Sequence, residues 1–271
     1  MLLRKGYRIV KSRYIKALGL GYVKRRITAG PIKGLWFIAG KRVFYSKDFW
    51  SGTYEENFCC FLQKTVPEDA VCYDIGANIG YHTLIMAHSV DNGGLVYAFE
   101  PIPEVCEVLT RNAQINNLHN VVVVNKVVSR ESGTLSLIRN IDIDQAILSA
   151  ETKKKNPLRE TITCAATTID EFVAAGNRSP SFLKVDVEGA EVDVLAGSID
   201  TLRKYHPIIV CETHGVARAH GVYEILTDLN YELFCVNAGM VPIDSITQMP
   251  NNMYEGHVFA RRKKHYGENV L

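Results

Sequence analysis

The stretch VCYDIGANIGYH, residues 71–82, decides the fold that this sequence predicts. An apolar run ends in Asp74, and glycines follow at positions 76 and 80. The apolar run predicts a buried strand, and the glycines predict a tight turn into a helix that begins near Tyr81. The segment therefore indicates a strand, a loop and a helix in direct succession.

Strand and helix patterns continue to alternate along the chain after this stretch. We expect strands within residues 94–100, 120–124, 181–189, 207–212, 231–236 and 256–261, and helices within 81–90, 103–116, 168–176, 190–205 and 216–229. The strands are nearly all apolar, which is typical of parallel strands covered by helices on both faces. The sequence predicts an α/β fold with a doubly wound, mostly parallel sheet, and the last two strands predict an antiparallel edge.

The composition is that of a soluble globular protein. With 271 residues, of which 47% are hydrophobic and 22% charged, the chain can bury a sizeable core, and disorder or a fibrous protein is excluded. Seven cysteines without a C-x-x-C pair predict reduced thiols. No apolar run is long enough to span a bilayer and no signal peptide is evident, so we expect a cytoplasmic protein.

Basic residues are concentrated at the N-terminus. Residues 1–47 carry 13 Lys and Arg and no acid, whereas the remainder carries 18 basic and 29 acidic residues. Apolar residues recur among these cations at helical spacing, which predicts a basic amphipathic helix within residues 1–26. Such a helix would lie on an anionic membrane surface, which would make the protein membrane-peripheral, or it would lie on a nucleic acid. In the simpler interpretation, the helix docks on the body of the protein and its cations are solvated. We therefore divide the chain into a basic extension, residues 1–50, and a main domain, residues 51–271, with a polar insertion at about 140–160.

Polar residues gather at the carboxyl ends of the predicted strands. In a doubly wound sheet, ligands bind outside these ends, near the point where the strand order reverses. The segments at the strand ends are Asp74 to Gly80, Glu100 and Pro101, Asn125, Asp186 to Glu188, and Glu212 to His214. An apolar strand does not require acids at its end, so these segments are predicted to form the ligand site.

The loop within residues 74–80 differs from a dinucleotide-binding loop in one respect. A loop that binds a diphosphate carries G-x-G-x-x-G, and Asn78 stands at the position of the middle glycine. Its side chain would occupy the space of the diphosphate, which favours a nucleoside cofactor without one. Glu100, at the end of the second strand, is placed to accept hydrogen bonds from two ribose hydroxyls.

These segments resemble the FkbM-type S-adenosylmethionine-dependent methyltransferases. The matching motifs are YDIGANIGYHTLIMA, VYAFEPIPEV, TIDEF, FLKVDVEGAEVDVLAG and IIVCETHG, and the resemblance covers about residues 50–236. It implies the Rossmann-like class I methyltransferase fold and the cofactor S-adenosylmethionine (SAM), with methyl transfer to hydroxyl groups of natural products and sugars. The extension and the insertion match no family pattern, and we expect them to select the substrate.

The resemblance also implies where SAM binds. The cofactor would lie over the loop formed by Gly76, Ala77, Asn78 and Gly80, with its ribose on Glu100 beside Pro101. Its methionine end would lie near Asp74 and its adenine towards Asn125. The acceptor is expected to be a hydroxyl-bearing small molecule or a glycan.

A cluster of polar residues is expected where the methyl group is transferred. A strand period of two places Lys184, Asp186 and Glu188 on one face, and Glu212 and His214 repeat this spacing on the next strand. An alcohol has a high pKa, so a base or a metal must help remove its proton. Tyr54 and Glu55, before the first strand, would fold over the cofactor, or in the simpler interpretation the acidic pair caps a helix; His82 is expected to be a core or helix-surface residue.

Several roles are open within this cluster. His214 is a natural general base, and Lys184 serves as a base if desolvation lowers its pKa, or holds an alkoxide. In an alternative arrangement, Asp186 and Glu212 would bind a divalent cation such as Mg²⁺. In the plainest interpretation Lys184 is a counter-ion and His214 caps the following helix.

Two other functional classes fit the sequence less well. A nicotinamide-dependent oxidoreductase is disfavoured by Asn78 and by the lack of a Tyr-x-x-x-Lys set. A nucleic-acid methyltransferase would use the basic arm on phosphates, but the chain lacks the D/N-P-P-Y/F/W motif for amino-group methylation. Nucleic acid is therefore not the expected partner.

Overall fold

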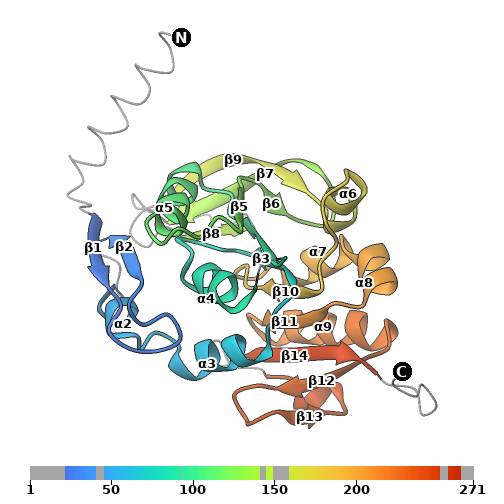
Figure 1. Cartoon of the computed structure of the whole chain (residues 1–271). Helices are drawn as coiled ribbons and strands as arrows, with labels where there is room; N and C mark the ends of the chain where they lie inside the picture. The colour runs from blue at the N-terminus through green and yellow to red at the C-terminus, as the bar shows by residue number, and fades with distance from the viewer. Residues whose placement is uncertain are drawn as a thin grey trace.

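A computed structural model describes residues 22–40, 46–91, 93–140, 145–148, 159–250 and 256–263 (Figure 1). Its centre is a sheet with the strand order β13-β12-β14-β11-β10-β3-β4-β5. The strands are β3 (Val71–Ile75), β4 (Leu95–Phe99), β5 (Val121–Val124), β10 (Phe182–Val185), β11 (Ile208–Glu212), β12 (Tyr231–Cys235), β13 (Val241–Ile243) and β14 (His257–Arg262). The alternation predicted from the sequence is confirmed.

The strand directions give the class I methyltransferase arrangement. Strands β5, β4, β3, β10 and β11 run parallel, and β14 lies antiparallel between β11 and β12. The two strands predicted to form an antiparallel edge are β12 and β14, and they do pair antiparallel. The edge itself is a further short strand, β13, which pairs antiparallel with β12. The order reverses between β3 and β10, and this switch point positions the ligand site.

Helices cover both faces of the sheet (Figure 1). They are α2 (Ser46–Ser51), α3 (Glu56–Thr65), α4 (Tyr81–Ser89), α5 (Pro103–Gln114), α6 (Ile169–Ala174), α7 (Glu191–Ala196), α8 (Ile199–Tyr205) and α9 (Val216–Asp228). Successive residues of β3 face opposite cores: Cys72 packs with apolar residues of α3, α4 and α5, and Tyr73 packs with those of α6 to α9. This alternation follows from the strand period of two.

The helix predicted over residues 190–205 is interrupted. It divides into α7 and α8 at Gly197, where an added Cβ would lie 2.2 Å from the carbonyl oxygen of Ser129. The chain passes too close to a neighbouring segment for any larger residue. The predicted N-cap of α6 is confirmed, since the Thr168 side chain accepts a hydrogen bond from the Glu171 amide at 2.9 Å.

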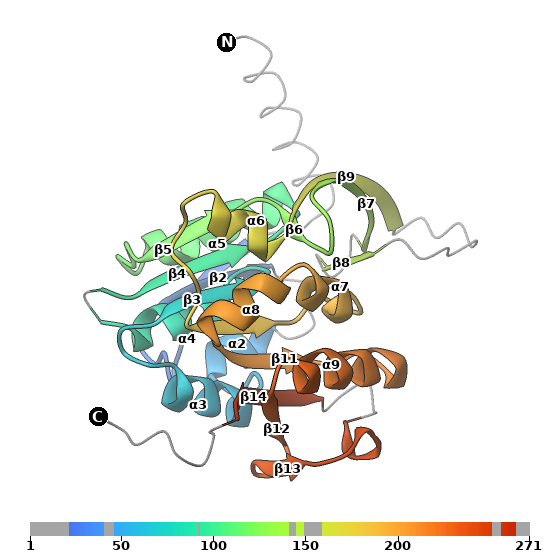
Figure 2. The same ribbon diagram turned by 90° about the vertical axis from the view of Figure 1, so that its right-hand side faces the viewer.

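A second sheet, with the order β6-β9-β7-β8, is inserted between β5 and α6. Its strands are β6 (Val127–Val128), β7 (Gly133–Asn140), β8 (Gln145–Leu148) and β9 (Arg159–Thr167). Figures 1 and 2 place it at the end of the molecule opposite β12 and β13. The polar insertion expected at 140–160 therefore lies between paired strands, and its residues 141–144 and 149–158 lie outside the described part of the chain.

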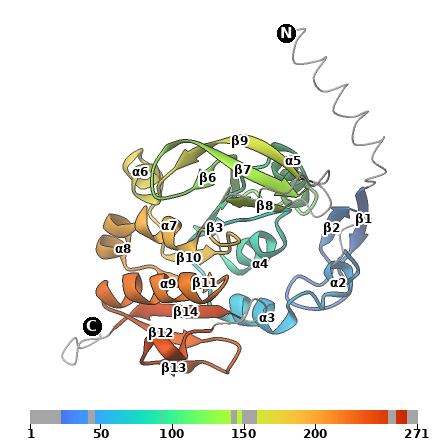
Figure 3. The ribbon, with the colours of Figure 1, turned by 180° about the vertical axis from the view of Figure 1, so that it is seen from behind.

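The extension forms a hairpin where the structure describes it. Strand β1 (Tyr22–Arg26) pairs antiparallel with β2 (Trp36–Gly40), and both lie with α2 at one flank of the molecule (Figure 3). The helix expected from the apolar spacing of residues 3–18 lies outside the described part of the chain, which begins at residue 22; residues 22–26 satisfy their backbone groups by strand pairing. Within the described residues, no helix has the length and apolar character that crossing a bilayer requires.

Candidate functional site

A cavity of about 660 Å³ opens at the carboxyl ends of β3, β4, β10 and β11. Among the residues predicted from the sequence, those that line it are Gly76, Ala77, Asn78, Glu100, Pro101, Asp186, Glu188, Glu212 and His214. The switch point thus brings together side chains that are up to 138 positions apart in the sequence. Asp74, Gly80, Asn125 and Lys184 support these residues from outside the lining.

The loop after β3 depends on its two glycines. Gly76 has a φ of 82°, and an added Cβ would lie 1.8 Å from the Asp186 carbonyl oxygen. Gly80 has a φ of 92°, and an added Cβ would lie 2.9 Å from Leu109 on α5. Both positions combine a left-handed backbone with a close approach, so the loop is held between β10 and α5.

Glu100 is held in position by the same loop. Its carboxylate accepts hydrogen bonds from the backbone N–H of Asn78 at 3.1 Å and of Ile102 at 2.9 Å. The side chain is buried but borders the cavity. These two bonds fix the orientation of the carboxylate at the edge of the cavity.

Asn125 lies next to the turn that follows β4, outside the cavity lining. Its side-chain amide donates to the carbonyl oxygens of Glu100 and Pro101, each at 2.9 Å. It therefore stabilises the turn after β4, and the residues that follow it, Lys126 to Val128, line the cavity.

These features fit a nucleoside cofactor. The cavity lies within the range of about 300–1,000 Å³ that small-molecule sites occupy. Gly76, Ala77 and Asn78 bring the loop to the edge of the cavity, and Glu100 presents an oriented carboxylate beside them. Asn78, whose φ is 49°, occupies the loop where a diphosphate would need backbone alone.

Asp74 and Lys184 form a buried ion pair behind the cavity. The Lys184 Nζ lies 3.1 Å from Asp74 Oδ1 and 3.4 Å from Asp186 Oδ2, and the Thr83 hydroxyl donates to Asp74 Oδ2 at 2.6 Å. Burial lowers the pKa of Lys184, but the charges of Asp74 and Asp186 outweigh it and raise the pKa above its usual range. Lys184 is therefore a protonated counter-ion rather than a base.

His214 is oriented by a buried carboxylate. Its Nδ1 lies 2.6 Å from Oε1 of Glu191, which has no exposed surface and also accepts from the Gly189 amide at 2.9 Å. The other ring nitrogen, Nε2, lies 3.5 Å from Glu188 and 3.7 Å from Glu212. Burial lowers the pKa of His214, but the hydrogen bond to Glu191 and the surrounding carboxylates raise it to about 9.

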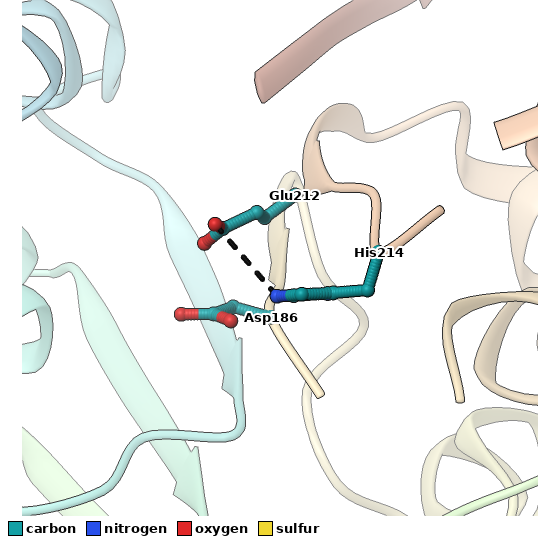
Figure 4. Close-up of side chains that lie close together, drawn as sticks. All are labelled: Asp186, Glu212 and His214. Atoms are coloured by element: carbon teal, nitrogen blue, oxygen red, sulfur yellow. Dashed lines mark ion pairs between the residues drawn. The ribbon is translucent and has the colours of Figure 1, made fainter. Parts of the chain in front are cut away.

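Asp186, Glu212 and His214 converge at one point (Figure 4). One ligand atom from each lies within 4.8 Å of the others, so among the described residues this group is spaced to hold a metal ion. Burial and the charge of Asp186 raise the pKa of Glu212 to about 8. Burial also raises the pKa of Asp186, but Lys184 lowers it overall. Two carboxylates that repel each other in this way would be stabilised by a cation or a proton.

Another part of the cavity wall comes from Tyr54 and Glu55, which the sequence predicts either to fold over the cofactor or, more simply, to cap a helix. Glu55 does occupy the N-cap position of α3, but its side chain makes no capping hydrogen bond. Its Oε2 lies 3.3 Å from Nε2 of His82, which is also in the lining. The only sequence signal was an acid pair before a strand, which does not indicate contact with a histidine 27 positions away.

His257, on β14, completes this wall from behind. It stacks on Phe58 with 3.8 Å between ring centroids, and its Nε2 lies 3.6 Å from Oε2 of Glu212. Burial lowers the pKa of His257 to about 4, so the ring is neutral near pH 7. Glu212 thus lies between His214, whose pKa is raised, and His257, whose pKa is lowered.

Known proteins show similarity to this chain. The profile of the Methyltransferase FkbM domain matches residues 74–233. The hexuronic acid methyltransferase AglP of Haloferax volcanii is 29% identical over 175 residues, which cover 64% of this chain and 68% of that protein. The methyltransferase sdnD of Sordaria araneosa is 32% identical over 159 residues, covering 57% of this chain and 56% of that protein.

A solved structure is also similar. The methyltransferase FkbM of Methylobacillus flagellatus aligns with 71% of this chain and 44% of its own, with a TM-score of 0.47 and 13% identity. The family profile spans more than half of the chain and contains the loop after β3, Glu100, Asp186 and His214. The chain belongs to the FkbM methyltransferase family and is a SAM-dependent methyltransferase.

Proposed function

We propose that this enzyme transfers the methyl group of SAM to a hydroxyl oxygen of a sugar, a glycan, a glycolipid or another polyhydroxylated natural product. The observation that carries the proposal is the His214–Glu191 pair at the end of the cavity. It presents a ring nitrogen to the space beyond the loop, where an acceptor hydroxyl would lie.

The donor side is assigned from the cavity lining. The loop from Gly76 to Gly80 and Glu100 would hold SAM, with Lys126 to Val128 beside its base. When bound, the cofactor supplies an activated methyl group and its own leaving group. The protein must then align an acceptor, accept its proton and exclude water.

The acceptor side is acidic and rich in hydrogen-bond acceptors. Asp186, Glu188 and Glu212 face the cavity beside His214, and Glu55 also lines it. Carboxylates accept hydrogen bonds from hydroxyl groups, so several of them favour an acceptor with several hydroxyls. Deprotonated His214 would take the proton of one hydroxyl at Nε2, while Glu191 stabilises the charge that the ring gains.

The similarity to a hexuronic acid methyltransferase supports a sugar acceptor. At 29% identity it supports the class of acceptor rather than its identity. Sugar hydroxyls are uncharged near neutral pH, which is compatible with an acidic wall.

A divalent cation is a second route to the same proton. Asp186, Glu212 and His214 would hold a cation such as Mg²⁺, which would lower the pKa of a bound hydroxyl. The carboxylate repulsion that raises the pKa of Glu212 favours this route. In this case the acceptor oxygen would be deprotonated without His214 as the base.

The test has two stages. Calorimetry first measures binding of S-adenosylhomocysteine (SAH) to the purified protein; absence of binding by a folded sample would refute the donor assignment. Methyl-labelled SAM is then incubated with the protein and a cell extract, and labelled products are identified by mass spectrometry. We expect label on sugar hydroxyls, resistant to nucleases, and label in nucleic acid would overturn the proposal.

A variant tests the cluster, and chelation separates the two routes, because His214 is the base in one route and a metal ligand in the other. His214→Gln should abolish labelling, and His119→Gln, at an exposed histidine, should not change it. If a cation acts, chelation should stop turnover and Mg²⁺ should restore it. Activity that is indifferent to chelation would assign proton removal to His214.

A further inference from the structure

The β1–β2 hairpin carries exposed cations with no acid in the same segment. Residues 22–40 contain Lys24, Arg25, Arg26 and Lys33, and all four are exposed. None of them forms an ion pair with an acid among the described residues. We refer to these four residues as the basic hairpin face.

Three of these cations lie on tryptophan rings. Lys24 Nζ lies 4.5 Å and Arg26 Cζ 5.0 Å from the ring centroid of Trp36, and Arg25 Cζ lies 4.7 Å from that of Trp50. The strand period places Lys24 and Arg26 on one side of β1 and Arg25 on the other. Trp36 is half-buried and Trp50 is buried, so the two rings lie beneath the cations and hold them in place.

The hairpin is fixed to the body of the protein. The side chains of Asn112, on α5, and Asn116, in the turn after α5, accept from the amides of Ile38 and Trp36 at 2.7 and 2.8 Å. Their amide groups donate back to the carbonyl oxygens of the same two residues at 3.1 and 2.7 Å. Because four hydrogen bonds hold β2, the cations are presented on a rigid surface.

The hairpin is also close to the cavity. The Trp50 indole donates to the carbonyl oxygen of Phe37, and the preceding residue of α2, Phe49, lines the cavity. Arg25 therefore lies against Trp50 of α2, and the neighbouring residue of the same helix, Phe49, lines the cavity. Figure 3 shows β1, β2 and α2 together at this flank.

The charge distribution of the chain orients this flank. Residues 1–21, which precede β1, contribute six more cations and no acid, interleaved with Leu3, Tyr7, Val10, Tyr14 and Leu18. Beyond residue 47, acids exceed basic residues by 11. An anionic surface would attract the basic flank and repel the rest of the molecule.

We propose that the basic hairpin face docks the protein on an anionic phospholipid bilayer with the α2 wall of the cavity next to the membrane. Phospholipid headgroups supply the negative charge to which the four exposed cations are complementary. Nucleic acid fits less well, because Lys24 and Arg26 cover the Trp36 ring on which a base would stack.

The experiment measures sedimentation of the full chain with phospholipid vesicles. One set contains phosphatidylcholine alone, and the other contains about one third phosphatidylserine. We expect binding only to the phosphatidylserine vesicles, with a strong decrease at high salt. Each cation near the surface strengthens binding roughly fivefold, so K24E/R25E/R26E should weaken it by at least about 100-fold.

A matched control is available on α8. Lys204 lies 4.9 Å above the exposed ring of Tyr205, beside exposed Arg203, so R203E/K204E reverses a similar pair of cations on another surface. This variant should bind vesicles as the wild type does. A single variant, Lys33→Glu in the exposed β1–β2 turn, gives a milder test, with a loss of about fivefold or more.

The outcomes are distinct. Binding to both vesicle types, no binding, or equal loss in the α8 variant would each overturn the proposal. Tighter binding of a single-stranded RNA oligonucleotide that displaces the protein from vesicles would also overturn it. SAH binding measured on the same variants shows that they are folded, and it tests the methyltransferase proposal separately, because the hairpin cations do not line the cavity.

Discussion

The Nδ1 atom of His214 lies 2.6 Å from the Oε1 atom of Glu191, and this contact determines which ring nitrogen faces the cavity. Glu191 is the first residue of α7 and is fully buried. Because the Gly189 amide binds the same oxygen, the carboxylate cannot turn away without losing two hydrogen bonds. His214 therefore keeps its Nδ1–H on Glu191 and its Nε2 towards the acceptor.

Replacement of Glu191 by glutamine should change the titration of His214. The isosteric amide keeps the size of the side chain but removes the charge that favours imidazolium, so the pKa should fall from about 9 towards 6.5. NMR of isotope-labelled histidine rings measures this pKa without any acceptor. Asp193→Asn on the same helix, where the carboxylate pairs with exposed Arg130, should leave it unchanged. An unaltered pKa in the Glu191 variant would contradict the assigned orientation.

Removal of the Glu100 carboxylate should weaken cofactor binding. Loss of two charge-assisted hydrogen bonds costs about 3 kcal/mol, which is roughly a 150-fold increase in the Kd of SAH for Glu100→Ala. Calorimetry measures it, with Glu107→Ala on the exposed side of α5 as the control. Equal affinities of the two variants would refute the ribose assignment.

The part of the site around Glu100 was predictable because its signals are local. The apolar strands, the glycines at 76 and 80 and the acid at the end of β4 each lie within one strand–loop–helix unit. Ligands bind at the carboxyl ends of parallel strands, so this rule predicts that strand–loop–helix units far apart in the sequence contribute to one site. The same rule predicts that Asp186, Glu212 and His214 form one cluster, and the structure brings their ligand atoms within 4.8 Å of one another.

The remaining parts depend on contacts that no sequence period encodes. The approach of Glu55 to His82 follows from how α3 packs against α4, and β1 forms because β2 is available as a partner. Spacing on β10 placed Lys184 in the catalytic group, but burial beside Asp74 makes it a counter-ion. The division of the chain at residue 50 stays a prediction, although β2 is bound to α5.

Gly76→Ala should destabilise the protein and abolish SAH binding. The new methyl group would lie 1.8 Å from the Asp186 carbonyl oxygen in a left-handed conformation, at a cost of at least about 3 kcal/mol. Gly176→Ala is a matched control, because Gly176 is also left-handed but has no atom within 4 Å of the added Cβ. Its cost should be about 1 kcal/mol, from backbone strain alone. Similar unfolding free energies for both variants, measured in urea, would show that the loop tolerates displacement from β10.

The Glu55–His82 ion pair should make stability depend on pH. Burial lowers the pKa of His82, but contacts with Cys59 and Glu55 raise it to about 10. Burial raises the pKa of Glu55, but His82 lowers it to about 2. The contribution of His82 to the free energy of unfolding is therefore complete below about pH 6.5 and is lost as the pH rises through about 10. The contribution of Glu55 is complete above about pH 4.5 and is lost as the pH falls through about 2.

Glu55→Gln should accordingly cost most stability near pH 6 and progressively less as the pH approaches 10. The variant leaves a buried imidazolium without its counter-ion, and because about a third of the Glu55 side chain is exposed, the cost should be about 2 kcal/mol rather than the 3–5 kcal/mol of a fully buried pair. Urea unfolding near pH 6 and near pH 10 measures the difference, with Glu56→Gln at the exposed neighbouring position as the control. A cost that is the same at both pH values would show that Glu55 acts through packing rather than through its charge.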